Sequence, residues 1–256
     1  MKRLGFVGTG AITCAIVKGM AKSALKDWPI AVSPRSRDRA EVLAAAIPSV
    51  SVAADNQSAV DASDIVFLAI RPQIAVEVIS ALRFHSGQVI ISLVAGMAIE
   101  TVKSMVPAGI PVIRAIPLPS VEACACATPV MPPHADATTI FNALGSAISV
   151  TDEAQFDGYV AGSAVMATYF GIVKAAADWM VANGVAEADA DGYFRTLFGN
   201  LGDIMRQRPG HSLDQLREEH TTKGGLNEMV HEIFLDEGGA TALCKGLDAV
   251  LARIRA

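Results

Sequence analysis

Charged residues, aromatic residues and cysteine are all scarce in this sequence of 256 residues, and each shortage excludes a class of protein. Asp, Glu, Lys and Arg make up 18% of the chain, the net charge is −5, and the basic residues form no long run. We therefore expect neither nucleic acid nor an anionic membrane as a partner. The core must be mainly aliphatic, since 52% of residues are hydrophobic but only 5% are aromatic. So little charge also indicates that a subunit interface covers part of the surface.

The four cysteines are not arranged for a zinc site. Cys124 and Cys126 are separated by one residue, no second pair lies nearby, and the five histidines supply no spaced set of ligands. We therefore expect no metal, thiols that are structural or incidental, and a location in the reducing cytoplasm.

Long apolar segments are also missing. The apolar residues at the N-terminus are broken by Gly8, Gly10 and Lys18, which is unlike a secretory signal. No run of about 18 uncharged apolar residues is found, so we expect no membrane span.

The first half of the chain alternates short apolar runs with helical patterns, which is typical of βαβ units around a parallel sheet. Prolines exclude helix over much of residues 117–149, and a short strand near Ile148–Val150 is expected to close the sheet. The predicted strands are Leu4–Gly8, Ile30–Ser33, Val50–Val52, Ile65–Ile70, Gln88–Leu93 and Ile110–Ala115, and the predicted helices are Ala11–Ser23, Arg37–Ala46 and Ile74–Leu82.

The pattern becomes wholly helical from about Thr151, with helices expected at Phe156–Val181, Asp189–Gln207 and Gly225–Glu237. The predicted fold is an α/β N-terminal Rossmann domain (residues 1–150) with a mostly parallel, doubly wound sheet, followed by an all-α C-terminal domain (151–256). Small residues in the weakly charged run Tyr159–Val181 allow helices to approach closely. We expect the C-terminal domain to form a homodimer, or an assembly of dimers, through this run.

A glycine-rich turn directly follows the first predicted strand and opens the first predicted helix. Its residues are Gly8-Thr9-Gly10-Ala11-Ile12-Thr13. The first glycine permits the tight turn, and the second lets backbone N–H groups approach a pyrophosphate at the helix N-terminus. Thr13 replaces the usual glycine or alanine at the third position. A purely structural turn is the alternative, but its place inside a βαβ pattern favours a dinucleotide site.

The residues after the second predicted strand favour NADPH over NADH, which is kept as the weaker alternative. NAD enzymes usually carry an acid there for the ribose hydroxyls, whereas this chain has Ser33, Arg35 and Arg37. A hydroxyl and two guanidiniums suit a 2′-phosphate. The other interpretation is a solvated basic loop.

Together these motifs resemble the pyrroline-5-carboxylate reductase family over nearly the whole chain. The residues that carry the resemblance are Gly5–Gly10, Val32–Pro34, Asp55-Asn56, Ser63–Pro72, Ile91–Gly96, Arg114–Pro117 and Thr222–Glu228. The resemblance implies an NAD(P)H-binding domain and a helical domain whose helices interleave with those of a second subunit. It also implies that Asn56, Ala69, Arg71, Pro72 and Ala95 line the cofactor.

The resemblance further implies that the loop Thr222–Asn227 and Ser163 bind a small imine substrate. Asn227 is the candidate catalytic residue, hydrogen-bonded to the ring nitrogen, and Thr222, Gly224 and Gly225 would bind the carboxylate. A glycine-rich turn can form such an anion site. The alternative for this loop is a plain helix start.

Several residues depart from the family near the expected substrate. Leu118 follows Pro117 where the family commonly has asparagine, and Val165 and Met166 replace a serine and a glycine. Lys223 and Asn227 replace a proline and a threonine. Reduction of 1-pyrroline-5-carboxylate to proline is the expected function, and two alternatives stay open: reduction of another small cyclic imine or carbonyl compound, and cofactor binding without turnover.

Overall fold

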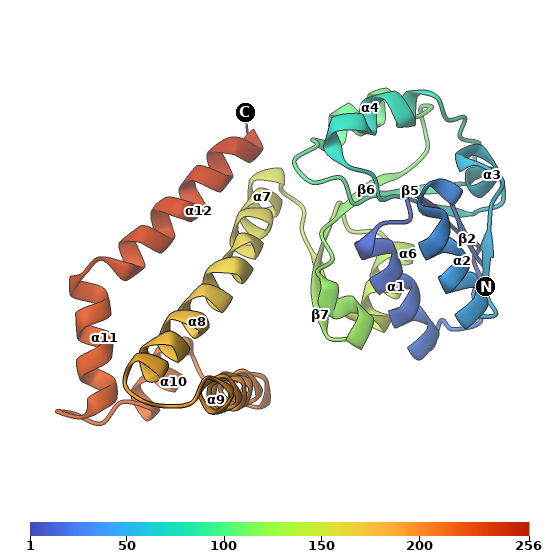
Figure 1. Ribbon diagram of the computed structural model, residues 1–256. Helices are drawn as coiled ribbons and strands as arrows, with labels where there is room; N and C mark the ends of the chain where they lie inside the picture. The colour runs from blue at the N-terminus through green and yellow to red at the C-terminus, as the bar shows by residue number, and fades with distance from the viewer. Residues whose placement is uncertain (256) are drawn as a thin grey trace. The chain divides into compact units, whose positions relative to one another are not determined.

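The structure is a computed structural model that describes residues 1–255, and the chain divides into two compact units (Figure 1). One unit contains Met1–Val160 with the last residues of the chain, and the other contains Ala161–Arg253. The division falls inside helix α7 (Glu153–Gly162), later than the boundary expected near Val150.

The first unit is built on one eight-stranded sheet with the strand order β3-β2-β1-β4-β5-β6-β7-β8. Neighbouring strands are parallel except β6 and β7, which are antiparallel. The predicted mostly parallel, doubly wound sheet is confirmed. The strands are β1 (Leu4–Val7), β2 (Ile30–Val32), β3 (Val50–Val52), β4 (Ile65–Leu68), β5 (Val89–Ser92), β6 (Val112–Ala115), β7 (Cys126–Met131) and β8 (Gly145–Ser149).

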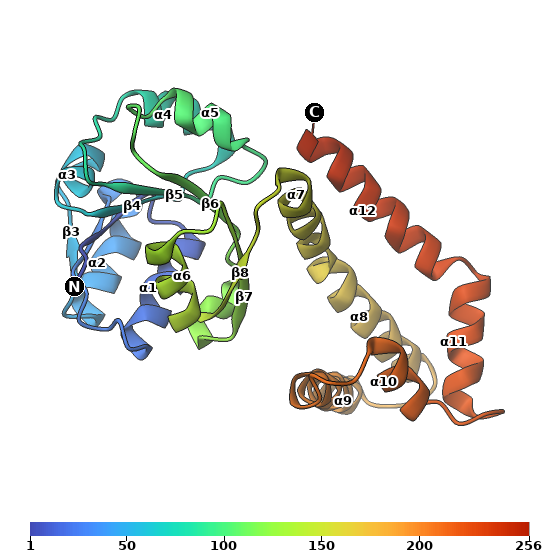
Figure 2. The same cartoon turned by 180° about the vertical axis from the view of Figure 1, so that it is seen from behind.

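Helices cover both faces of this sheet, which is why its strands β1, β2 and β4 are buried and apolar throughout (Figure 2). On one face Phe6 of β1 stacks on Phe67 of β4 with ring centroids 4.5 Å apart, and Phe141 packs edge-on against Phe67. The helices of that face are α1 (Ala11–Lys22), α2 (Arg37–Ala46) and α6 (Ala135–Ala143), and those of the other face are α3 (Asn56–Asp61), α4 (Pro72–Ser80), α5 (Ile99–Ser104) and α7.

The proline-rich segment contains more regular structure than the sequence indicated. Strand β7 and helix α6 both lie within residues 117–149. Pro129 fits within β7 because it lies just beyond the last residue pair of the β6–β7 ladder. Its carbonyl accepts a hydrogen bond from the Ile116 N–H. Because the ladder ends there, the N–H that proline lacks is not needed for this pairing. Pro132 and Pro133 precede α6 and leave it uninterrupted.

The second unit is all helical, as predicted. It contains two helices that the sequence analysis did not predict, α10 and α12, and a short 3₁₀ turn that separates α7 from α8. Its elements are the 3₁₀ turn η3 (Ser163–Val165), α8 (Met166–Ala182), α9 (Glu187–Gln207), α10 (Leu213–Glu219), α11 (Leu226–Asp236) and α12 (Gly239–Arg255).

Large apolar side chains of this unit are exposed. Phe170 and Trp179 of α8 are 68% and 67% exposed, and no residue of α8 is buried. By length and composition, the helical stretch Glu153–Ala182 could cross a membrane, in contrast to the sequence expectation. One such stretch is weak evidence for a span, because a helix that packs against protein has the same composition.

Candidate functional site

The carboxyl ends of β1, β2, β4 and β5 meet at one edge of the sheet and lead into Gly8, Ser33, Ala69 and Leu93. The chain order of the strands reverses between β1 and β4, and ligands of open α/β sheets bind at this switch point. The glycine-rich turn predicted from the sequence lies there.

Gly8 and Gly10 differ in what surrounds them. Gly8 has φ of +102°, and a Cβ on it would lie 2.4 Å from the carbonyl oxygen of Ala69. Gly10 has ordinary extended backbone, and a Cβ there would meet no described atom within 4 Å. Gly8 is therefore required by packing inside the sheet edge, whereas Gly10 borders open space.

Hydrogen bonds between the turn and Ser33, which follows β2, fix the conformation of the turn. The Gly8 N–H donates to Ser33 Oγ at 2.8 Å, and Thr9 Oγ1 donates to the Ser33 carbonyl at 2.6 Å. Thr13 Oγ1 donates to the Gly8 carbonyl at 2.7 Å, so threonine at the third motif position braces the turn. Ser33 is fully buried. Its hydroxyl therefore supports the turn, instead of facing a 2′-phosphate as the sequence suggested.

The two arginines after Ser33 are exposed, but only one is paired. Arg37 Nε lies 2.7 Å from Glu41 Oε1, and this hydrogen bond raises the pKa of Arg37. Arg35 forms no ion pair with any residue of 1–255. Arg35 is therefore the more available cation for a phosphate.

The N-terminus of α1 fits a pyrophosphate. Among residues 1–255, no side chain caps this helix at Gly10, so the backbone N–H groups of its first turn can bind an anion. The partial positive charge of a helix N-terminus and the open space at Gly10 favour the same ligand.

The other residues expected to line a cofactor lie along the same edge. Asn56 opens α3 beyond β3, and Ala69, Arg71 and Pro72 join β4 to α4. Ala95 follows β5 and is exposed. The structure thus brings these residues to the carboxyl ends of β3, β4 and β5, and their contact with a cofactor stays a prediction.

Sequence reasoning missed Arg114, a charged residue buried at the end of β6. Its Nη1 lies 2.8 Å from Glu153 Oε1 and 3.7 Å from Asp157 Oδ1, and its guanidinium lies over the ring of Phe156 at 4.5 Å. Burial lowers the pKa of Arg114, and the two carboxylates oppose this shift. A basic residue inside an apolar strand was the available signal. Arg114 joins the sheet to α7.

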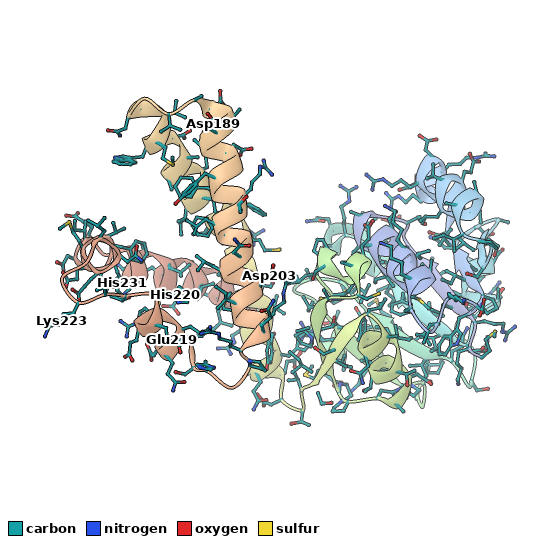
Figure 3. The ribbon with its side chains drawn as sticks, turned by 90° about the horizontal axis from the view of Figure 1, so that it is seen from below. Asp189, Asp203, Glu219, His220, Lys223 and His231 are labelled. Atoms are coloured by element: carbon teal, nitrogen blue, oxygen red, sulfur yellow. The ribbon has the colours of Figure 1, made fainter. Side chains whose placement is uncertain are left out.

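The expected substrate loop lies in the second unit, between α10 and α11. Gly224 has φ of +70°, and the Gly225 N–H donates to the Thr222 carbonyl at 2.8 Å. Asn227 Nδ2 donates to the His220 carbonyl at 2.8 Å, so the side-chain amide nitrogen of Asn227 already has a partner within the protein. Figure 3 shows Lys223 projecting outward from this loop.

Glu228, which the sequence analysis did not select, also belongs to this loop. Its carboxylate accepts a hydrogen bond from the N–H of Gly224. One of the two glycine N–H groups expected to bind a substrate carboxylate is therefore already bound to a carboxylate of the protein. Its place in the first turn of α11 was the signal in the sequence.

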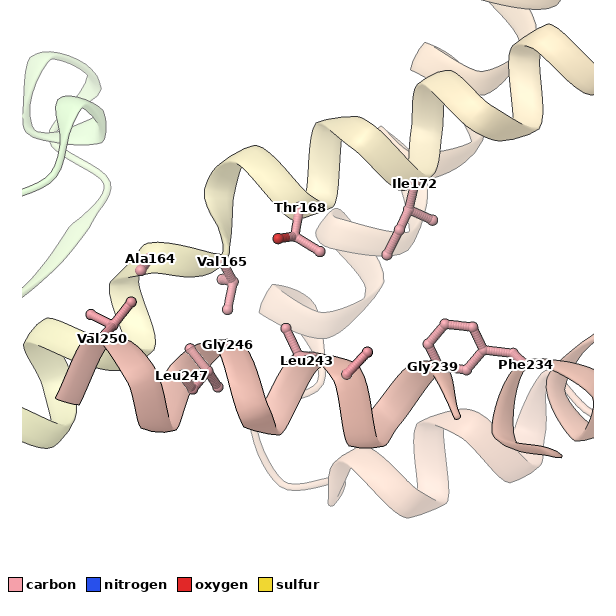
Figure 4. A pocket seen from close by; sticks show the side chains of 11 residues that line it. Ala164, Val165, Thr168, Ile172, Phe234, Gly239, Leu243, Gly246, Leu247 and Val250 are labelled. Carbon is pink, nitrogen blue, oxygen red and sulfur yellow. The ribbon is translucent and has the colours of Figure 1, made fainter. Parts of the chain in front are cut away.

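Ser163 is part of η3, beside an apolar groove of about 420 Å³ within the second unit (Figure 4). Val165, Thr168 and Phe234 line this groove together with residues of α12. Thr168 contributes the hydroxyl seen there. The departures from the family at residues 164–168 thus leave a largely apolar surface.

Within residues 1–255, no group of three or more His, Cys, Asp or Glu side chains could hold a metal ion.

Two segments of the chain match models of known families. Residues 3–96 match the family described as NADP oxidoreductase coenzyme F420-dependent. Residues 153–256 match the family described as pyrroline-5-carboxylate reductase dimerisation.

Characterised relatives match nearly end to end. The chain is 24% identical to pyrroline-5-carboxylate reductase of Haemophilus influenzae over 98% of this chain and 96% of that one. It is 27% identical to pyrroline-5-carboxylate reductase 2 of Bacillus subtilis, covering 89% of this chain and 85% of the relative.

Among solved structures, 1-pyrroline-5-carboxylate reductase of Streptococcus pyogenes superposes with a TM-score of 0.85 at 21% identity, covering 99% of this chain and 98% of that one. A reductive aminase from Aspergillus terreus in complex with NADPH has a TM-score of 0.59 at 20% identity, covering 82% and 78%. At these identities the likeness establishes the fold. In both halves the chain resembles the pyrroline-5-carboxylate reductase family.

Proposed function

We propose that this chain is an NAD(P)H-dependent oxidoreductase that reduces the C=N bond of a small cyclic imine, with NADPH as its preferred cofactor. The observation that carries the proposal is the Gly8–Gly10 turn at the switch point of the sheet, in a chain whose second half matches a reductase dimerisation family. The relatives named for this reaction support it.

The residues at the sheet edge fit the cofactor. The first turn of α1 would bind the pyrophosphate across the open face of Gly10, and Arg35 would bind the 2′-phosphate. Ser33 and Thr9 keep the turn in shape through their hydrogen bonds. When bound, the nicotinamide supplies a hydride to the imine carbon.

The residues of the second unit would then orient the substrate. A protonated imine is already activated for reduction, so no strong acid or base is required. Asn227 Nδ2 donates to the His220 carbonyl, and in this proposal its side-chain carbonyl oxygen would accept the N–H of the protonated ring nitrogen. That residue therefore holds the substrate and does not transfer its proton.

Reduction of 1-pyrroline-5-carboxylate to proline is the first of two candidate reactions, because it is the reaction for which the relatives are named. Val165, Met166 and Leu118 remove polarity that the family has near the substrate, which favours the alternative of another small imine or carbonyl compound. A protein that binds NADP without turnover is the remaining alternative.

One assay distinguishes these functions. The purified chain is mixed with NADPH and a panel of small cyclic imines and carbonyl compounds that includes 1-pyrroline-5-carboxylate, and loss of NADPH absorbance is followed. We expect turnover of at least one imine. NADPH binding without turnover of any imine or carbonyl compound at millimolar concentration would leave only the non-catalytic alternative.

The second unit is proposed to assemble the chain into a homodimer or an assembly of dimers in the cytoplasm. The exposed Phe170 and Trp179 and the match of residues 153–256 to a dimerisation family support this assembly. Light scattering at micromolar concentration should give a mass well above the 26.7 kDa of one chain. A stable, active monomer would contradict it.

A further inference from the structure

The Gly-Gly loop of the second unit carries its own carboxylate. Glu228 accepts a hydrogen bond from the N–H of Gly224, and the Gly225 N–H is bound to the Thr222 carbonyl. The two glycine N–H groups that could receive an anion are thus both satisfied within the chain. Lys223, the basic residue of the loop, projects outward (Figure 3).

A substrate carboxylate arriving at this loop would meet two obstacles. It would have to displace Glu228 from the Gly224 N–H, and it would then lie close to a group of the same charge. Two negative charges a few ångströms apart repel each other, and this repulsion is weakened but not removed by nearby solvent. A protonated imine without a carboxylate meets neither obstacle, since its positive charge is attracted by Glu228.

We propose that Glu228 determines substrate specificity, selecting small cyclic imines that lack a carboxylate next to the ring nitrogen over those that carry one. The proposal rests on the proposed reduction of a C=N bond and on the Thr222–Asn227 loop as the place where the substrate binds. It decides between the two catalytic functions left open above, and it makes 1-pyrroline-5-carboxylate a weak substrate of this chain.

A second role of Glu228 is structural. It occupies the third position of α11, from which a glutamate or glutamine side chain can reach back to the backbone N–H groups that precede a helix. Glu228→Gln keeps an oxygen for the Gly224 N–H and removes only the negative charge. The variant therefore separates specificity from helix capping.

The experiment compares steady-state kinetics of the full chain with NADPH on 1-pyrroline and on 1-pyrroline-5-carboxylate. For the wild type we expect the higher kcat/KM with 1-pyrroline. Glu228→Gln should raise kcat/KM for the carboxylate substrate about tenfold, mainly through KM, and should not raise it for 1-pyrroline. Glu232→Gln, which removes an exposed charge one turn further along α11, is the matched control and should change neither value by more than about twofold.

A second measurement needs no variant. Raising the ionic strength screens the repulsion, so it should lower the wild-type KM for 1-pyrroline-5-carboxylate and narrow the preference for 1-pyrroline. A wild type that prefers the carboxylate substrate, or a Glu228→Gln variant that changes both substrates equally, overturns the inference and leaves the reductase function in place. Turnover of neither imine removes the reductase function itself, and the inference with it.

Discussion

Replacing Gly8 and Gly10 by alanine, one at a time, should separate folding from cofactor binding within a single turn. At Gly8 an added Cβ would lie 2.4 Å from the carbonyl oxygen and 2.9 Å from the carbonyl carbon of Ala69, with φ at +102°. The left-handed backbone costs alanine about 1–2 kcal/mol, and overpacking against a backbone group adds about 1–3 kcal/mol. Gly8→Ala should therefore lower the unfolding free energy by about 2–5 kcal/mol, or Tm by roughly 5–15 °C.

The same substitution at Gly10 has different consequences. Its backbone, with φ of −87° and ψ of −171°, suits alanine, and the methyl group meets no described atom within 4 Å. Gly10→Ala should leave the unfolding free energy within about 0.5 kcal/mol of wild type. The methyl group does enter the space proposed for the pyrophosphate. Loss of one hydrogen bond to a charged group, about 1.5–3 kcal/mol, should raise the Kd for NADPH roughly tenfold to a hundredfold.

Thermal unfolding followed by circular dichroism and NADPH titration by calorimetry measure the two effects independently. Wild-type affinity for NADPH in Gly10→Ala would refute the position assigned to the pyrophosphate. A Gly8→Ala variant as stable as the wild type would refute the packing argument.

Three further predictions concern charged residues of the first unit. Arg35→Ala should weaken binding of NADPH about tenfold more than binding of NADH. Arg37→Ala should have less effect, because the guanidinium of Arg37 is already paired with Glu41. Equal losses of affinity for both cofactors in Arg35→Ala, measured by titration, would exclude Arg35 as the phosphate site. Arg114→Leu should lower the unfolding free energy by about 3 kcal/mol, because it removes the cation from Glu153 and leaves the buried Asp157 with Arg255 as its cation; an unchanged urea midpoint would contradict this. The Arg3 guanidinium, together with the Arg3 backbone N–H, lowers the pKa of Asp64 from 3.8 to about 2, so the small stabilisation from these contacts is present above pH 3.8 and lost as the pH falls to about 2. Arg3→Ala should reduce that acid-dependent difference in Tm without removing it, because the backbone N–H of residue 3 still donates to Asp64 Oδ2, and an identical pH profile in the variant would show that the guanidinium contributes nothing.

The first unit was largely predictable because its signals are local. The buried strands β1, β2 and β4 are continuous apolar runs, and the turn Gly8–Gly10 follows β1 directly in the sequence. Strand β7 and helix α6 were missed because prolines were expected to exclude helix over much of residues 117–149. Pro129 in fact lies where one pairing ends, which only the register of β6 and β7 reveals.

The candidate site was predictable in its location but not in its hydrogen bonds. The register that pairs Phe6 with Val32 brings Ser33 beside Gly8 and turns its hydroxyl inward. No spacing in the sequence specifies this contact between residues 25 positions apart. Glu228 was missed for another reason: a carboxylate in the first turn of a helix is common, and its significance comes from the loop that it binds.

The three hydrogen bonds that Ser33, Thr9 and Thr13 make around the turn also bear on the rate at which a cofactor associates. They fix the turn when the sheet folds, so its conformational entropy is lost at that stage and not when the ligand arrives. Association should then proceed in a single step, with an observed rate that rises linearly with NADPH concentration in stopped-flow measurements. A Ser33→Ala variant, whose Gly8 N–H loses its acceptor, should introduce a slower phase that saturates as the turn reorders before it can bind.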